Sequence, residues 1–106
     1  MADTLSVDAE RHRGKAIDAA KRAAEALAAV GVTAKITGSL ARGTFGPHSD
    51  IDFLVTACPR HLKYTIESVV EDVLDGIHFD VVYLDELPAW KVRHFTEGAV
   101  DASDLC

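Results

Sequence analysis

The pattern of apolar and polar residues predicts that the first third of the chain forms a helix and then a strand. Residues 7–30 are rich in alanine and lack proline. Their apolar side chains recur every three to four positions, which is typical of an amphipathic helix. Gly31 stands where such a helix ends. Residues 32–37 are mostly β-branched and predict a short strand, and residues 38–49 are expected to form a loop rich in glycine and small residues.

A second strand and a second helix are expected in the middle of the chain. Residues 51–56 predict the strand. Pro59 favours the start of the helix, and Gly76 favours its end. The apolar stripe of this helix comprises Leu62, Ile66, Val69, Val70, Val73 and Leu74.

The last third of the chain predicts one more strand and one short helix. Residues 79–84 form the strand. Asp85 is placed to cap the helix, which we expect to stop near Gly98. We expect Trp90 and Phe95 on this helix to lie in the core rather than at an interface.

This order of elements predicts a single small α/β (α+β) domain over residues 1–106, in which helices cover a mixed sheet. With 48% hydrophobic and 26% charged residues, the composition is that of a globular protein. No apolar run approaches the roughly 20 residues that span a bilayer, and the amino terminus lacks the features of a signal peptide. Cys58 and Cys106 form neither a metal-binding spacing nor a disulfide framework, so the cytoplasm is the expected location.

The charge balance argues against one class of partner. The chain has 17 acidic and 11 basic residues, a net charge of −6. Proteins that bind the backbone of a long nucleic acid usually have a basic surface, so we expect no stable nucleic acid binding by this chain. A small phosphate ligand could still be bound through a metal ion.

Three aspartates stand where a sheet usually has apolar residues. Asp50 and Asp52 flank an isoleucine, so they share one face of the second strand and leave the other face to the core. Asp80 lies in the third strand. If the two strands are neighbours, the three carboxylates converge. The alternative is that Asp50 ends a turn and Asp80 points to solvent, and an isolated Asp-x-Asp favours that alternative.

A convergent cluster would require a cation. Two carboxylates about 4 Å apart repel each other by about 4 kcal/mol at an effective dielectric constant near 20. That is a large share of a typical folding free energy of about 5–15 kcal/mol. Carboxylate oxygens are ligands that Mg²⁺ prefers.

The loop before the second strand carries a possible phosphate site. Gly38 and Ser39 follow a strand and precede a stretch, residues 39–43, that could form a turn of helix. Glycine allows a ligand to approach the backbone closely, and the amides at a helix amino terminus hold anions. The alternative is that Ser39 only caps the helix.

The loop and the acids together resemble a known active-site motif. The segment reads Gly38-Ser39-Leu40-Ala41-Arg42-Gly43-Thr44-Phe45-Gly46-Pro47-His48-Ser49-Asp50-Ile51-Asp52. It resembles the motif of the nucleotidyltransferase fold shared with DNA polymerase β, and in particular that of the minimal nucleotidyltransferases. Asp80 falls where that family has its third acid. The ending Phe95-Thr96-Glu97-Gly98 is also similar, so the resemblance covers about residues 32–98.

This resemblance implies a mechanism and assigns roles. Asp50 and Asp52 would bind two Mg²⁺ ions, and Asp80 would complete the metal site nearest the acceptor and act as a base. Gly38 and Ser39 would hold the β- and γ-phosphates. The implied substrate is ATP, and the implied products are a nucleotidyl ester and pyrophosphate.

Five further residues have two interpretations each. Arg42 would contact phosphate or pair with a nearby acid. Ser49, a candidate nucleotide-binding residue, would touch the substrate or brace the turn before the aspartates. His48 would approach the nucleotide or be structural. Tyr64 and Tyr83 would accept a nucleotide in self-modification or be structural.

The resemblance also implies a partner. Larger relatives add a helical domain that binds the acceptor, and nothing after residue 98 is expected to form one. Stand-alone members are commonly antitoxins that transfer AMP to a tyrosine of a helical HEPN ribonuclease toxin. Two alternatives stay open. One is the catalytic subunit of a two-chain enzyme acting on a small molecule such as an antibiotic, and the other is an antitoxin that acts by binding alone.

Overall fold

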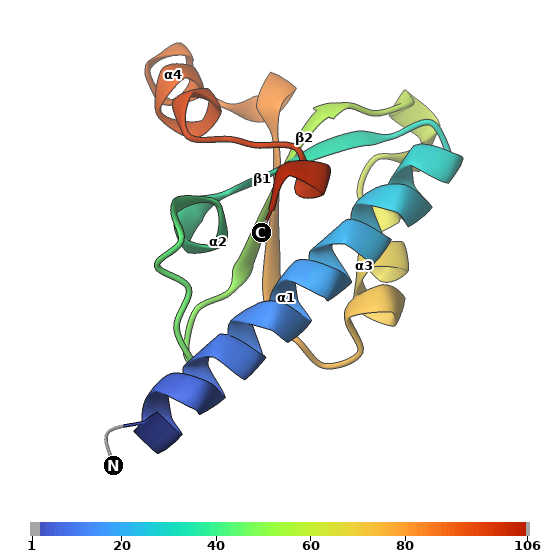
Figure 1. Ribbon diagram of the computed structural model, residues 1–106. Coiled ribbons are helices and arrows are strands. Elements are labelled where there is room, and N and C mark those ends of the chain that lie inside the picture. The colour runs from blue at the N-terminus through green and yellow to red at the C-terminus, as the bar shows by residue number, and fades with distance from the viewer. Residues whose placement is uncertain (1–2, 106) are drawn as a thin grey trace.

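The computed structural model describes residues 3–105, and the side chains of residues 10–105 (Figure 1). The elements follow the predicted order: α1 (Asp3–Ala29), β1 (Thr33–Thr37), α2 (Gly38–Arg42), β2 (Ile51–Ala57), α3 (Ile66–Leu74), β3 (Phe79–Tyr83) and α4 (Ala89–Glu97). Short 3₁₀ turns precede α3 and α4 and follow α4. None of the helices within residues 3–105 has the length and apolar character needed to cross a bilayer.

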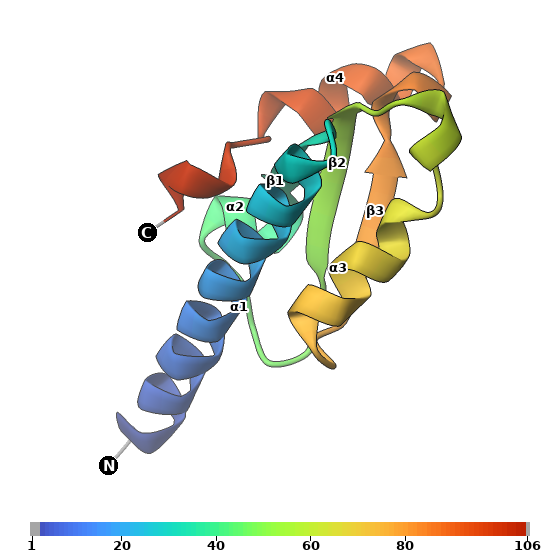
Figure 2. The same ribbon diagram turned by 90° about the vertical axis from the view of Figure 1, so that its right-hand side faces the viewer.

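The three strands form one mixed sheet in the order β1-β2-β3. The pair β1 and β2 is antiparallel, and the pair β2 and β3 is parallel. Helices α1 and α3 contact each other and lie together over one face of the sheet (Figure 2). This arrangement confirms the predicted α+β fold with a mixed sheet, and it leaves the opposite face of β2 and β3 to other segments.

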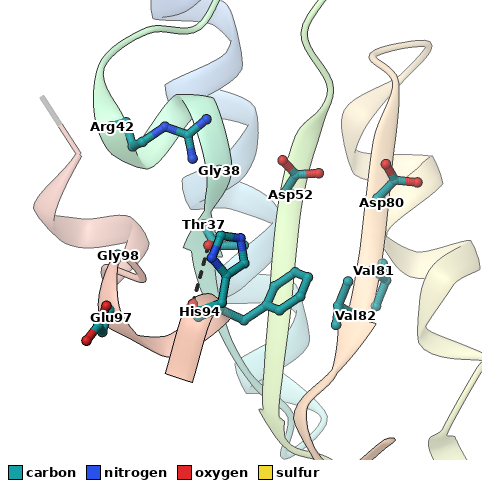
Figure 3. Close-up of a pocket in the computed structure, with 11 residues that line it drawn as sticks. Thr37, Gly38, Arg42, Asp52, Asp80, Val81, Val82, His94, Glu97 and Gly98 are labelled. Carbon is teal, nitrogen blue, oxygen red and sulfur yellow. Dashed lines mark hydrogen bonds between the residues drawn. The ribbon is translucent and has the colours of Figure 1, made fainter. Parts of the chain in front are cut away.

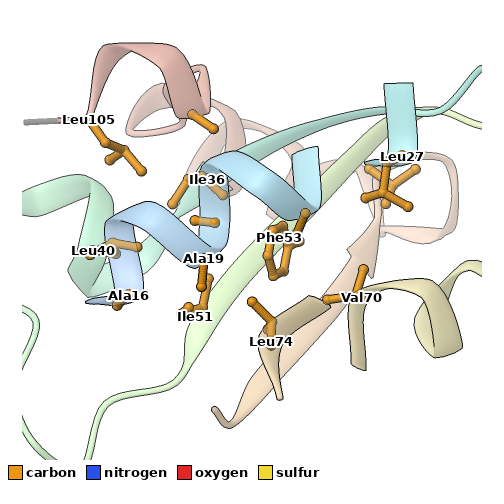
Figure 4. Packing of buried hydrophobic residues seen from close by; sticks show 14 of the residues in the cluster. Ala16, Ala19, Leu27, Ile36, Leu40, Ile51, Phe53, Val70, Leu74 and Leu105 are labelled. Atoms are coloured by element: carbon orange, nitrogen blue, oxygen red, sulfur yellow. The ribbon is translucent and has the colours of Figure 1, made fainter. Parts of the chain in front are cut away.

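The core lies between this sheet and the two helices (Figure 4). Residues 51, 53 and 55 of β2 are at most 3% exposed, as the alternation of strand side chains predicts. They pack with the apolar stripe of α3 and with a row of small residues on α1. That row comprises Ala16, Ala19, Ala20 and Ala23. Because alanine side chains are short, α1 can approach the sheet closely.

The predicted helix start at Pro59 is wrong. A 3₁₀ turn, Arg60–Leu62, follows Pro59, and α3 begins only at Ile66. The backbone leaves the helical conformation at Tyr64, whose φ of 71° lies in the left-handed region. The backbone N–H of Tyr64 donates to the hydroxyl of Tyr83 at 2.9 Å, instead of to a helix carbonyl. A tertiary contact therefore overrides the helix signal.

The last helix also differs from its prediction at its start. Asp85 does not cap α4. It lies in a 3₁₀ turn, Leu84–Glu86, and pairs with Lys63 at 2.8 Å. Pro88, which lacks an N–H, occupies the position before α4, and the helix ends before Gly98 as expected.

The expectation that Trp90 lies in the core is wrong. Its side chain is 76% exposed, whereas Phe95 is half-buried. The two positions are five residues apart, which separates them by about 140° around a helix. They cannot both face the sheet, and α4 places the side of Phe95 inward.

Candidate active site

A cavity of about 760 Å³ opens on the face of the sheet opposite α1 and α3 (Figure 3). Its walls come from the end of β1, from α2, from β2 and β3, and from α4. The lining residues are Thr37, Gly38, Arg42, Asp52, Asp80, Val81, Val82, His94, Phe95, Glu97 and Gly98. Four segments that are far apart in the sequence therefore meet around one space.

Two of the three predicted carboxylates lie side by side in this cavity. Asp52 and Asp80 are partners in the parallel register of β2 and β3, and Figure 3 shows their side chains on the same face of the sheet. Burial raises the pKa of Asp52, and the negative charges of Asp80 and Asp50 raise it further. The charge of Arg42 acts in the opposite direction. The site thus concentrates negative charge that the protein alone does not neutralise.

Asp50 lies at the border of the site. It is exposed, directly precedes β2, and does not line the cavity, although its charge reaches Asp52. No three His, Cys, Asp or Glu side chains within the described part of the chain are placed to hold a metal ion together. Asp52 and Asp80 therefore form the carboxylate pair of this structure, and the joint metal site with Asp50 stays a prediction.

Gly38 places the backbone against Asp52. Its φ is 70°, which favours glycine, and α2 begins at this residue directly after β1. A Cβ atom at this position would stand 2.1 Å from Oδ2 of Asp52. Any larger residue would therefore collide with the carboxylate, so the sequence motif has a steric reason for glycine here.

The remaining candidate residues differ in whether they line this cavity. Arg42 lines the cavity and makes no hydrogen bond or ion pair with the described residues, but its charge acts on Asp52, so both interpretations of Arg42 stay predictions. Ser39 lies in α2 beside Gly38 but does not line the cavity. Ser49 braces the turn, because its Oγ accepts a hydrogen bond from the N–H of Gly46 at 3.0 Å. Ser49 and His48 line a separate cavity, and their nucleotide-binding roles stay predictions.

The two tyrosines lie toward the other end of the strands. Tyr83 pairs with Val55 in the sheet, three residues beyond the pair of aspartates, and is only 5% exposed. Tyr64 is 58% exposed and hydrogen-bonds Glu86. Their contacts with each other support structural roles, and self-modification stays untested.

The comparison with protein families agrees with this geometry. The family described as nucleotidyltransferase domain matches residues 17–100, which is most of the chain. This chain belongs to the nucleotidyltransferase domain family. No curated protein and no solved structure gives a significant match. The match extends over all the elements that line the cavity, and nucleotidyl transfer is the reaction class of the family.

Sequence reasoning missed the part of the nucleotidyltransferase site that α4 supplies. His94, Glu97 and the ring of Phe95 line the cavity, and the hydroxyl of Thr37 donates to the carbonyl of Phe95 at 3.4 Å. The only available signal was the ending from Phe95 to Gly98, which resembles that of the minimal enzymes. The side of α4 that faces the sheet follows from its packing and not from the motif.

Proposed function

We propose that this nucleotidyltransferase domain is a Mg²⁺-dependent adenylyltransferase that modifies a partner protein. In this proposal it transfers AMP from ATP to a tyrosine of a HEPN-type ribonuclease toxin and thereby neutralises the toxin. The observation that carries the catalytic part is the pair Asp52 and Asp80 in one cavity, with Gly38 against Asp52. The choice of partner rests on the resemblance of the loop to that of the minimal nucleotidyltransferases.

The residues present fit Mg²⁺. Asp52 and Asp80 offer hard oxygen ligands from neighbouring strands, and Asp50 is close enough to influence the charge state of Asp52. The pKa of Asp52 is raised first by burial and then by repulsion from Asp80 and Asp50, and a bound cation would relieve that repulsion. Mg²⁺, when bound, neutralises triphosphate charge and lowers the pKa of an acceptor hydroxyl.

The other residues bind and orient the substrates. The backbone at Gly38 and Ser39 holds the β- and γ-phosphates, and Arg42 supplies a positive charge to the same anion. The oxygen of the tyrosine hydroxyl attacks the α-phosphorus of ATP, and the bond from that phosphorus to the bridging oxygen breaks. Pyrophosphate leaves, and Asp80 accepts the proton of the hydroxyl. Most of the rate enhancement comes from positioning and charge stabilisation.

An intact-mass measurement tests this proposal. The protein is mixed with MgATP and the product of the neighbouring gene, alongside the double variant Asp50→Asn/Asp52→Asn. Asp72→Asn is the matched control, because Asp72 is an exposed acid on α3. We expect the partner to gain one or more adenylates with the unmodified protein and with the control, and none with the double variant.

The other outcomes separate the alternatives. A stable complex without any mass change would reject protein modification and favour an antitoxin that acts by binding. An adenylated small molecule, with an unmodified partner, would identify a two-chain enzyme. Neutralisation that persists in full with the double variant would show that catalysis is not the mechanism.

A further inference from the structure

His94 on α4 faces the candidate active site, although no part of the motif includes it. The imidazole projects from α4 toward the end of β1 and the start of α2, and the guanidinium of Arg42 points into the same space (Figure 3). The ring of His94 meets the ring of Phe95 edge-on, with centroids 5.6 Å apart. Among the described residues it has no hydrogen bond or ion pair. Its ring nitrogens are therefore available to a ligand.

Charge is distributed unevenly around the cavity. The carboxylates of Asp52 and Asp80 occupy the strands, and Arg42 and His94 are the basic side chains of the lining. Glu97 also lines the cavity, but Arg93 pairs with it at 2.7 Å and compensates its charge. The cavity thus has an anionic side on the sheet and a side with hydrogen-bond donors on the two helices.

A hydrogen bond holds α4 next to Gly38. The Oγ1 atom of Thr37 donates to the backbone carbonyl of Phe95, the residue after His94. Thr37 is 7% exposed and is directly followed by Gly38. This contact joins α4 to the point where β1 passes into α2, so His94 is held beside the backbone to which we assign the phosphates.

We propose that His94 donates a hydrogen bond to the β- or γ-phosphate of the bound nucleoside triphosphate, together with Arg42. This inference rests on the proposed function. Ionised carboxylates accept hydrogen bonds and cannot donate them to phosphate oxygens, so the donors for the triphosphate must come from the helices. During transfer, negative charge develops on the departing pyrophosphate, and a hydrogen bond from His94 stabilises that charge without a proton transfer.

Ligand-binding calorimetry tests this role without the acceptor. The ligands are ATP, pyrophosphate and AMP, each with Mg²⁺, and the variants are His94→Ala, His94→Gln and the control His61→Ala. His61 is also exposed but does not line this cavity. We expect His94→Ala to weaken ATP and pyrophosphate about tenfold, which is the usual loss for a hydrogen bond to a charged group. We expect His94→Gln, which keeps a donor, to recover part of that loss.

The pattern across the ligands decides the outcome. AMP lacks the β- and γ-phosphates, so its affinity is expected to stay unchanged in every histidine variant. Equal losses for ATP and AMP would overturn the inference and assign His94 to the base, the ribose or the α-phosphate. Unchanged affinities for all three ligands would overturn it as well, and a raised KM for the acceptor in a separate transfer assay would then assign His94 to the acceptor.

The variant Asp52→Asn distinguishes failure of this inference from failure of the proposed function. If Asp52→Asn weakens MgATP binding and His94→Ala does not, the inference alone fails. If Asp52→Asn also leaves MgATP binding unchanged, the proposed function fails, and the inference fails with it.

Discussion

The substitution Gly38→Ala tests the geometry of the site most sharply, because it adds one methyl group beside Asp52. The new Cβ would stand 2.1 Å from Oδ2 and 3.1 Å from Cγ of Asp52. Non-bonded heavy atoms normally stand about 3.5 Å apart, so the carboxylate must move by about 1 Å or more. A misplacement of about 1 Å in an active site can lower the rate about a hundredfold.

Gly38→Ala also destabilises the backbone, and a control variant can separate this effect from the collision with Asp52. Gly38 has a φ of 70°, and an L-residue in this left-handed region is disfavoured by about 1–2 kcal/mol. Gly43, with a φ of 80°, has the same backbone conformation, but nothing lies within 4 Å of a Cβ built there. Gly43→Ala therefore carries the backbone cost without the collision.

Two measurements separate the two effects. Thermal unfolding should show a lower Tm for both variants, by about 4–16 °C for the backbone cost of about 1–2 kcal/mol. Transfer of adenylate to the partner should fall about a hundredfold for Gly38→Ala and change little for Gly43→Ala. MgATP affinity, measured by calorimetry, should follow the same order. Equal activities in the two variants would refute the claim that the position of the Asp52 carboxylate controls the reaction.

Three further predictions concern charge and local structure. Asp52→Asn removes a like charge opposite Asp80, so without Mg²⁺ it should raise the Tm by about 2–4 °C while abolishing transfer. The raised pKa of Asp52 means that the metal-free folded state binds a proton more tightly than the unfolded chain. The contribution of Asp52 to folding stability is therefore present at low pH and lost as the pH rises through that pKa. In thermal melts over a range of pH, the Tm of Asp52→Asn should fall less over this rise than the Tm of the unmodified protein. Tyr83→Phe leaves the N–H of Tyr64 without its acceptor and should lower the Tm by about 4 °C, with calorimetric MgATP affinity unchanged.

The alternation of side chains along a strand made half of the site predictable. It separates Asp52 from Phe53, because successive residues of a strand face opposite sides of the sheet. The position of Asp80 could not be obtained in this way. It depends on β3 lying parallel to β2 with Asp80 directly beside Asp52, and a long-range register leaves no periodic signal in the sequence. The family resemblance supplied that information.

The errors in the predicted fold have a common physical cause in tertiary contacts. Pro59 normally favours a helix start, but the hydrogen bond between Tyr64 and Tyr83 holds a left-handed residue in the middle of the expected helix. The segment after α4 gave no prediction. Its Val100 exchanges two backbone hydrogen bonds of 2.8 Å with Ile36. A bridge of one residue pair is too short to give the alternation of apolar and polar residues that predicts a strand.

The transfer of label from ATP to the partner tests the central claim most directly. Parallel reactions contain Mg²⁺, the partner, and ATP labelled at either the α- or the γ-phosphate, with the unmodified protein, with Asp52→Asn and with the control Asp72→Asn. We predict that the α-label enters the partner and the γ-label leaves in pyrophosphate, and that only Asp52→Asn prevents this. Label that enters from the γ-phosphate, or α-label that enters equally with Asp52→Asn, would contradict nucleotidyl transfer at this site.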